Sequence, residues 1–243
     1  MSELLPRARG TFTQTLFDAL RSDDAKGLPR APDVEEPLVD DEFQLALWVC
    51  YELHYRGFRD VSDEWEWRPE LIELRSHLES AHLNALRDAV DVGTGGASVP
   101  DRVWRLVTDD DAPSVARFVQ RQASREQVLE LAAHRSIYQL KEADPHTWAI
   151  PRLAGRSKAA LVEIQADEYG QGQLHRMHSE LFAKTLRGLG LDDSYAAYVD
   201  AVPGVTLSIT NTISLFGLHR ALVGALVGHL AAYEMTSSAP SRS

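Results

Sequence analysis

The sequence is poor in cysteine and lacks the signature motifs of several enzyme classes. Its one cysteine, Cys50, lies in the apolar run LWVCYEL and has no second cysteine with which to form an internal disulfide. There is no Gly-rich phosphate loop, no GxSxG nucleophile elbow, no paired-cysteine zinc motif and no HExxH. These absences argue against P-loop nucleotide hydrolases, α/β-hydrolases and common zinc proteins. The single thiol fits a reducing cytoplasm, where we expect the protein to be located.

Basic residues are also scarce, and no long apolar run interrupts the chain. Lys and Arg number 25 against 36 Asp and Glu, which gives a formal charge of −11 and a pI near 5.3. This balance argues against nucleic-acid and anionic-membrane partners. The most apolar segment, 201–235, contains Thr, Ser, Asn, His and Arg and is more typical of a buried core helix than of a membrane span. We therefore expect a small-molecule partner, and self-association into a homodimer stays open.

Hydrophobic spacing predicts an all-α fold. No run alternates with period two, and apolar residues recur at helical spacing along most of the chain. A capping box of Ser124 and Gln127 predicts one helix start. The predicted helices cover 11–20, 40–57, one from Pro69 to the glycines near 93–96, one or two within 101–123, then 124–144, 156–188, 192–202, and 203–235 as one helix or a kinked pair. Such bundles commonly build metal or ligand sites from side chains on facing helices.

Three domain segments are expected from composition. Residues 1–39 form an N-terminal helix and a linker rich in Pro, Asp and Gly. Residues 40–238 form the helical domain, and residues 239–243 form a disordered tail.

Carboxylates and imidazoles concentrate in the stretch from Glu142 to His178. The set Glu142, Glu163, Glu168, His175 and His178 offers the ligand mixture that suits iron or manganese and that bundle-type dimetal sites use. On a continuous helix of about 100° per residue, His175 nearly eclipses Glu168, whereas His178 is about 80° away. The helical wheel therefore favours His175.

The order and spacing of three of these residues resemble a known family. Glu142 in QLKEADPHTWAIPRL, Glu168 in EIQADEYG and His178 in RMHSELF stand 26 and 10 positions apart. This is similar to the first part of the metal-binding signature of heme-oxygenase-like dimetal oxidases, the iron-containing redox enzyme family. The segments YELHYRGF from Tyr51 and LFGLHRALVGALVGHLAAYEMTSS from Leu215 also resemble this family. The resemblance covers roughly residues 40–238.

The resemblance implies a heme-oxygenase-like helical bundle with non-heme iron at Glu142, Glu168 and His178. One or two iron ions are implied, manganese also suits the ligands, and Glu168 could bridge a pair. Dioxygen and a small organic substrate are the implied reactants. The resemblance favours His178 over His175. Glu163, five positions before Glu168, points to another face and is expected to bond an Arg or water, and His146 is expected to orient Glu142 or cap its helix.

One departure from the family pattern leaves alternatives open. The His-xxx-Asp-xx-His pattern that completes the family's site does not occur in this sequence, so we expect either a fragment or a truncated homologue. A metal-free helical binding protein is one alternative. A thiaminase-like hydrolase on the same fold is another, and Cys50 would be its nucleophile.

Overall fold

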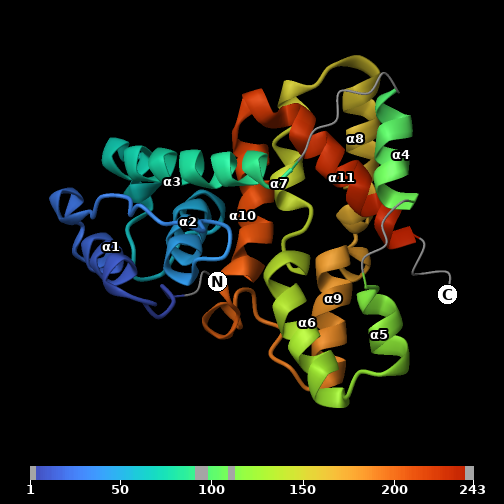
Figure 1. Cartoon of the computed structure of the whole chain (residues 1–243), viewed down its shortest axis with the longest axis horizontal. Helices are drawn as coiled ribbons and strands as arrows, with labels where there is room; N and C mark the ends of the chain where they lie inside the picture. Colours follow the sequence, from blue (N-terminus) through green and yellow to red (C-terminus); the bar gives the residue numbers. More distant parts are fainter. Residues whose placement is uncertain (1–3, 91–97, 109–112, 239–243) are drawn as a thin grey trace. The chain divides into compact units, whose positions relative to one another are not determined.

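The computed structural model is helical and describes residues 4–90, 98–108 and 113–238 (Figure 1). These residues contain no β-strand, which confirms the predicted all-α class. The α-helices are α1 (Thr11–Ser22), α2 (Asp41–Tyr55), α3 (Pro69–Asp88), α4 (Val99–Thr108), α5 (Val115–Arg121), α6 (Arg125–Gln139), α7 (Asp144–Thr147), α8 (Gly155–Glu168), α9 (His178–Leu189), α10 (Gly204–Leu218) and α11 (Val223–Ser238). Short 3-10 helices are η1 (Ala25–Gly27), η2 (Asp63–Trp67), η3 (Ile150–Arg152), η4 (Gly170–Gly172), η5 (Leu174–Arg176), η6 (Val199–Ala201) and η7 (Arg220–Leu222).

The helices group into two compact units. Unit 1 comprises Met1–Asp91, Ser136–Tyr138 and Asp193–Leu215, and thus contains α1, α2, α3 and most of α10. Unit 2 comprises Val92–Arg135, Gln139–Asp192 and Phe216–Ser243, and contains α4, α5, most of α6, α7, α8, α9 and α11. The three domain segments expected from composition stay predictions.

Helix α2 forms the centre of unit 1. Every residue from Phe43 to Leu53 is buried, as expected of a helix that is apolar nearly all round. The one amide in this run, Gln44, accepts a hydrogen bond at 2.7 Å from Asn211 Nδ2 and lies 3.0 Å from His82 Nδ1 through its own Nε2. These polar contacts join α2 to α10 and α3. They also satisfy the Gln44 amide, which would cost about 1–3 kcal/mol if it were buried without partners.

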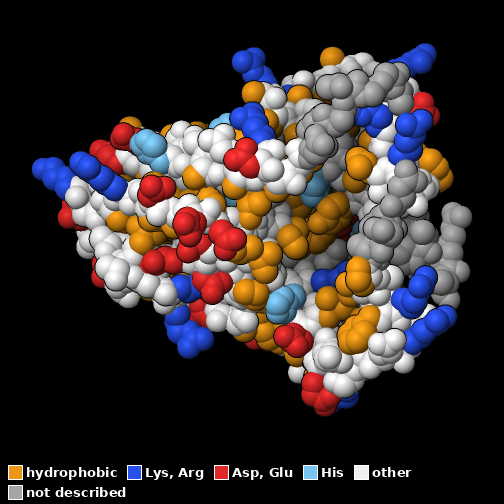
Figure 2. Space-filling model, viewed as in Figure 1, with side chains coloured by type: hydrophobic (Ala, Val, Ile, Leu, Met, Phe, Trp, Pro, Cys, Tyr) orange, Lys and Arg blue, Asp and Glu red, His pale blue; other side chains and the backbone are white. Residues whose placement is uncertain are grey.

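Two surface properties accompany this core. On the face drawn in Figure 2, acidic side chains gather over the part of unit 1 that contains α1, α2 and α3. Among the described residues no single helix is long and apolar enough to cross a membrane, although α10 and residues 220–236 pass that test together as a bent pair, by length and composition alone.

The start of α6 follows the sequence signal, whereas its end comes earlier than predicted. The predicted capping box precedes α6: Ser124 N donates to Gln127 Oε1 at 2.9 Å and Gln127 N donates to Ser124 Oγ at 3.3 Å. Helix α6 ends at Gln139, and Pro145 lies in the first turn of α7. Helix α11 packs against both α4 and α7. Residues 140–143 form the turn between α6 and α7.

Three predicted elements need comment. The predicted 192–202 helix is wrong, since only the short η6 forms there. The segment 203–235 is a broken pair, in which residues 219–222 separate α10 from α11. The glycines near 93–96 lie outside the described residues, so the predicted turn there stays a prediction.

Candidate metal centre

Glu142 lies in the turn between α6 and α7. Lys141 O accepts a hydrogen bond from Asp144 N at 3.0 Å, which closes the turn around Glu142. Pro145, three residues after Glu142, lies in the first turn of α7, where a missing N–H costs no helical hydrogen bond. Glu142 is half-buried, and its side chain extends from this turn.

Glu168 is the last residue of α8 and lies on the buried face of that helix. The buried residues of α8 are Leu161, Gln165 and Glu168, which follow one another at spacings of four and three and therefore share one face. Because Leu161 and Gln165 are buried on this face, the Glu168 carboxylate is directed toward the interior as well. Glu168 is only 8% exposed, which is unusual for a glutamate.

His178 is the first residue of α9, and a sharp break separates it from Glu168. The predicted continuous helix from 156 to 188 is wrong, because α8 ends at Glu168 and α9 begins ten residues later. Gly170 and Gln171 have φ values of +60° and +54°, in the left-handed region. A Cβ on Gly170 would approach Arg176 C and Met177 N to 2.5 Å, so the glycine permits the chain to fold back on itself.

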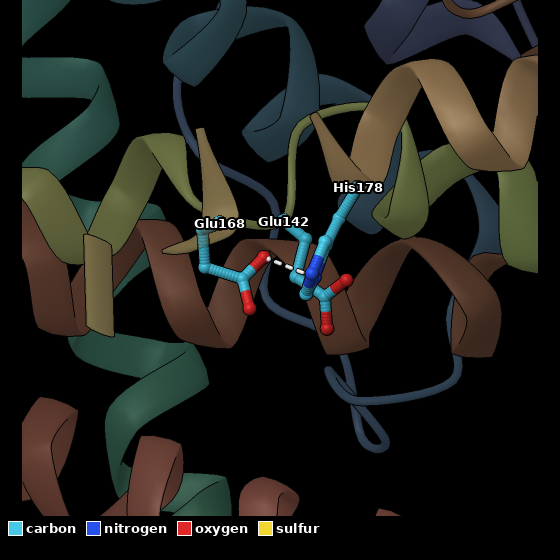
Figure 3. Close-up of side chains that lie close together, drawn as sticks. All are labelled: Glu142, Glu168 and His178. Carbon is cyan, nitrogen blue, oxygen red and sulfur yellow. Dashed lines mark ion pairs between the residues drawn. The ribbon is translucent and has the colours of Figure 1, made fainter. Parts of the chain in front are cut away.

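The fold-back brings Glu142, Glu168 and His178 together. Each offers one ligand atom, and these three atoms lie within 4.8 Å of one another. His178 Nδ1 is 2.9 Å from Glu168 Oε2, and Figure 3 shows the carboxylates and the imidazole turned toward one another. All three belong to unit 2. Their role as metal ligands stays a prediction, but two carboxylates and an imidazole at this separation form a donor set that one metal ion could share.

Burial and neighbouring charges both act on the Glu168 carboxyl. Burial raises the pKa of the Glu168 carboxyl to about 7, with the charges of Glu142 and Glu234 adding to the rise and His178 opposing it. Near neutral pH, Glu168 is therefore present in both its protonated and its charged form. A metal ion would offset this penalty by supplying positive charge beside the carboxylates of Glu142 and Glu168.

The other sequence candidates lie outside the cluster. His175 is exposed within η5, and Glu163 is exposed on α8. The helical wheel favoured His175 because it assumed a continuous helix, which the break at Gly170 removes. His146 is buried, and its Nδ1 lies 3.1 Å from the Glu142 carbonyl oxygen. Because a carbonyl can only accept, His146 Nδ1 carries the proton, and burial lowers its pKa to about 4.

Several neighbours of the cluster were not identified from the sequence. His229 of α11 stacks on His146 with ring centroids 6.1 Å apart, and on Tyr233 at 4.3 Å. Gln165 of α8 and Tyr169, which directly follows α8, form hydrogen bonds to the segment that follows Glu142. Gln165 is three residues before Glu168 and Tyr169 one residue after it, and this proximity in sequence could have identified both as neighbours of the cluster. No local signal marks His229, which is 83 positions from His146.

The thiol considered as a nucleophile is unsuited to that role. Cys50 belongs to unit 1, is fully buried within α2, and has its pKa raised to about 12 by burial. Because the thiolate is the reactive form, this thiol is inert at neutral pH. The hydrolase alternative thus loses its only cysteine.

Comparison with known proteins supports the resemblance for the part of the chain that contains the cluster. A family model described as iron-containing redox enzyme matches residues 129–243, which include Glu142, Glu168 and His178. Residues 40–128 lie outside this match, so the resemblance predicted there stays a prediction. No curated protein matches the chain. The family has a helical heme-oxygenase-like fold, in agreement with the helices described above. Over residues 129–243 the chain is therefore similar to the iron-containing redox enzyme family.

Proposed function

We propose that the protein is a non-heme iron oxidase or oxygenase that uses dioxygen on a small organic substrate. The observation that carries this proposal is the convergence of Glu142, Glu168 and His178 to within 4.8 Å, inside the part of the chain that matches an iron-containing redox family. Bound iron would supply the redox chemistry, and the protein would supply orientation and a controlled environment. Manganese is a second metal of suitable hardness.

The donor set favours iron bound directly by side chains over iron in a haem. Haem iron takes His, Cys, Met or Tyr as its axial protein ligand, whereas this cluster presents two carboxylates beside one imidazole. A mixture of carboxylate and imidazole with unfilled positions is typical of non-haem ferrous oxygenases. Three protein donors leave positions for dioxygen and substrate. The His178 side chain is 48% exposed, so small molecules can approach from its side.

Each residue of the cluster has a distinct task in this proposal. Glu142 and Glu168 supply negative charge that balances the cation, and His178 supplies a neutral nitrogen donor. Glu168 also accepts a proton when the metal leaves, since its pKa lies near 7. Whether one ion or two are held depends on donors beyond these three.

The proposal is tested by loading the purified protein with ferrous iron under anaerobic conditions and counting the bound metal. About one iron per chain, or two, is expected after removal of free iron. Metal at background level in the wild-type protein would end the proposal for this chain.

Iron affinity should depend on pH in a defined window. Because the folded Glu168 has its pKa raised from 4.5 to about 7, a proton competes with iron at every pH below 7. The apparent affinity should therefore rise about tenfold per pH unit from pH 5 to pH 7 and level off above that. Anaerobic titrations at several pH values measure this slope. An affinity that is flat between pH 5 and pH 7 would contradict a metal bound through Glu168.

A methyl group on Gly170 should weaken iron binding by displacing His178. In Gly170→Ala the new Cβ meets the backbone of Arg176 and Met177, directly before His178. We expect about a tenfold loss of iron affinity, as for changes that disturb the support of a metal ligand. Gly172→Ala is the matched control, because Gly172 has a φ of +77° but nothing within 4 Å of its Cβ position. Equal iron affinities in the two variants would refute this account of the break.

A further inference from the structure

Gln165 joins the turn that carries Glu142 to the helix that carries Glu168. Its Nε2 donates to the carbonyl of Ala143 at 2.8 Å and to Thr147 Oγ1 at 2.7 Å. The Ala143 carbonyl, one residue after Glu142, also accepts from Thr147 N at 3.2 Å. Because the amide of Gln165 faces a carbonyl, which can only accept, its orientation is fixed by chemistry. Gln165 is 3% exposed, so water competes little for these bonds.

Tyr169 forms a second connection between the same segments. Its hydroxyl donates to Asp144 Oδ1 at 2.9 Å and lies 3.0 Å from Thr147 Oγ1. The single hydroxyl proton of Thr147 is donated to the Ala143 carbonyl at 3.2 Å. Burial raises the pKa of Tyr169 to about 12, so the Tyr169 hydroxyl stays protonated at neutral pH.

The two connections flank Glu168 on α8. Gln165 lies three positions before Glu168 in α8, and Tyr169 is the residue directly after Glu168, at the C-terminal end of the helix. Their partners, Ala143, Asp144 and Thr147, directly follow Glu142. The bonds thus span the segments that hold the two carboxylates. None of the bonding atoms is a carboxylate oxygen of Glu142 or Glu168.

We propose that Gln165 and Tyr169 are positioning residues that clamp the Glu142 turn onto α8 and thereby set the separation of the Glu142 and Glu168 carboxylates. The clamp itself exists in the metal-free protein, whereas its effect on iron affinity rests on the proposed function. Partners of this kind, which hold a ligand in place without touching the metal, typically change metal affinity by about 10- to 100-fold.

The first experiment measures the clamp without iron. Hydrogen exchange of the backbone amides in residues 143–148 is compared in the metal-free wild type, Gln165→Leu and Tyr169→Phe. We expect about tenfold faster exchange in this segment in both variants, because the turn opens more often when one of its hydrogen bonds to Gln165 or Tyr169 is lost. Exchange in α9 should stay unchanged, because this opening is local. Exchange that stays at the wild-type rate in the turn would overturn the clamp.

The second experiment measures its effect on the metal. Gln165→Leu should weaken ferrous binding by about 10- to 100-fold. It should also change the electron paramagnetic resonance spectrum of the nitric oxide adduct of the bound iron, which reports ligand geometry. Tyr169→Phe should act in the same direction. Wild-type affinity and spectrum in both variants would refute the positioning role.

Two controls separate positioning from general destabilisation. Gln44→Leu removes the hydrogen bonds of another buried amide, in unit 1, and should lower the melting temperature while leaving iron affinity unchanged. Gln173→Leu changes an exposed glutamine near the break and should alter neither. A loss of iron affinity in Gln44→Leu equal to that in Gln165→Leu would assign the effect to stability and overturn the proposal. Wild-type protein that binds no iron but shows the expected exchange pattern would refute the metal centre and support the clamp.

Discussion

Glu168→Gln should abolish iron binding and stabilise the metal-free protein above pH 7. Glutamine keeps the shape of the side chain but removes the charge that iron needs. The same charge is costly in the absence of metal, because it is buried and lies near Glu142 and Glu234. The shift of the pKa from 4.5 to about 7, which already includes the opposing effect of His178, corresponds to roughly 3 kcal/mol.

The sign of the stability effect fixes its pH dependence. A carboxyl whose folded pKa is raised favours folding when protonated, so the wild type loses stability as the pH rises from 4.5 to 7. The difference between Glu168→Gln and the wild type should thus be absent below pH 4.5 and complete above pH 7. Melting temperatures of metal-free protein across this range measure it. Asp167→Asn, which changes an exposed neighbour on α8, should show neither effect. A Glu168→Gln variant that is less stable than wild type at pH 8 would contradict the account.

His178→Ala should remove iron binding, whereas His175→Ala should leave it intact. His178 Nδ1 lies 2.9 Å from Glu168, while His175 is exposed three residues earlier in η5. Loss of a direct donor should exceed the effect of supporting residues, so we expect a fall of about 100-fold or more. Both side chains are exposed, so neither change should lower the melting temperature by more than a few degrees.

Anaerobic titration of the two histidine variants beside the wild type decides between them. Equal losses in the two would indicate that iron is bound through general charge. A loss confined to His175→Ala would restore the helical-wheel assignment and refute the cluster.

The sequence was informative where local signals decide the structure. The capping box marked the start of α6 and was found where predicted, whereas the helix ends at Gln139, before the prolines that were expected to end it. The polar residues in the apolar segment around Asn211 indicated a buried helix, and Asn211 is indeed bonded to Gln44 in the core of unit 1. The all-α class follows from such signals, since each depends only on neighbouring residues.

Family spacing and helical geometry predicted different histidines beside Glu168, and His178 is the one that lies there. The family spacing selected His178, and the helical wheel selected His175. Three consecutive residues, Gly170, Gln171 and Gly172, adopt left-handed backbone conformations and end the helix, a feature that periodicity cannot reveal. The sequence spacing of the ligands in the family signature already includes such a break, whereas a helical wheel assumes that the helix is continuous.

What the sequence could not reveal depends on contacts between distant segments. The raised pKa of Glu168 requires the nearness of Glu234, which is 66 positions away. The bonds from Gln165 to Ala143 and Thr147 cross from α8 to a turn about twenty residues earlier. Side chains of these types are usually solvated, so only the fold shows which of them are buried and paired.

Anomalous X-ray diffraction at the iron absorption edge, from crystals of the ferrous-loaded protein, tests the central claim most directly. The account predicts a peak within bonding distance of Glu142, Glu168 and His178 together. A peak bound by other residues, or no peak at these three in crystals that hold iron, would contradict it.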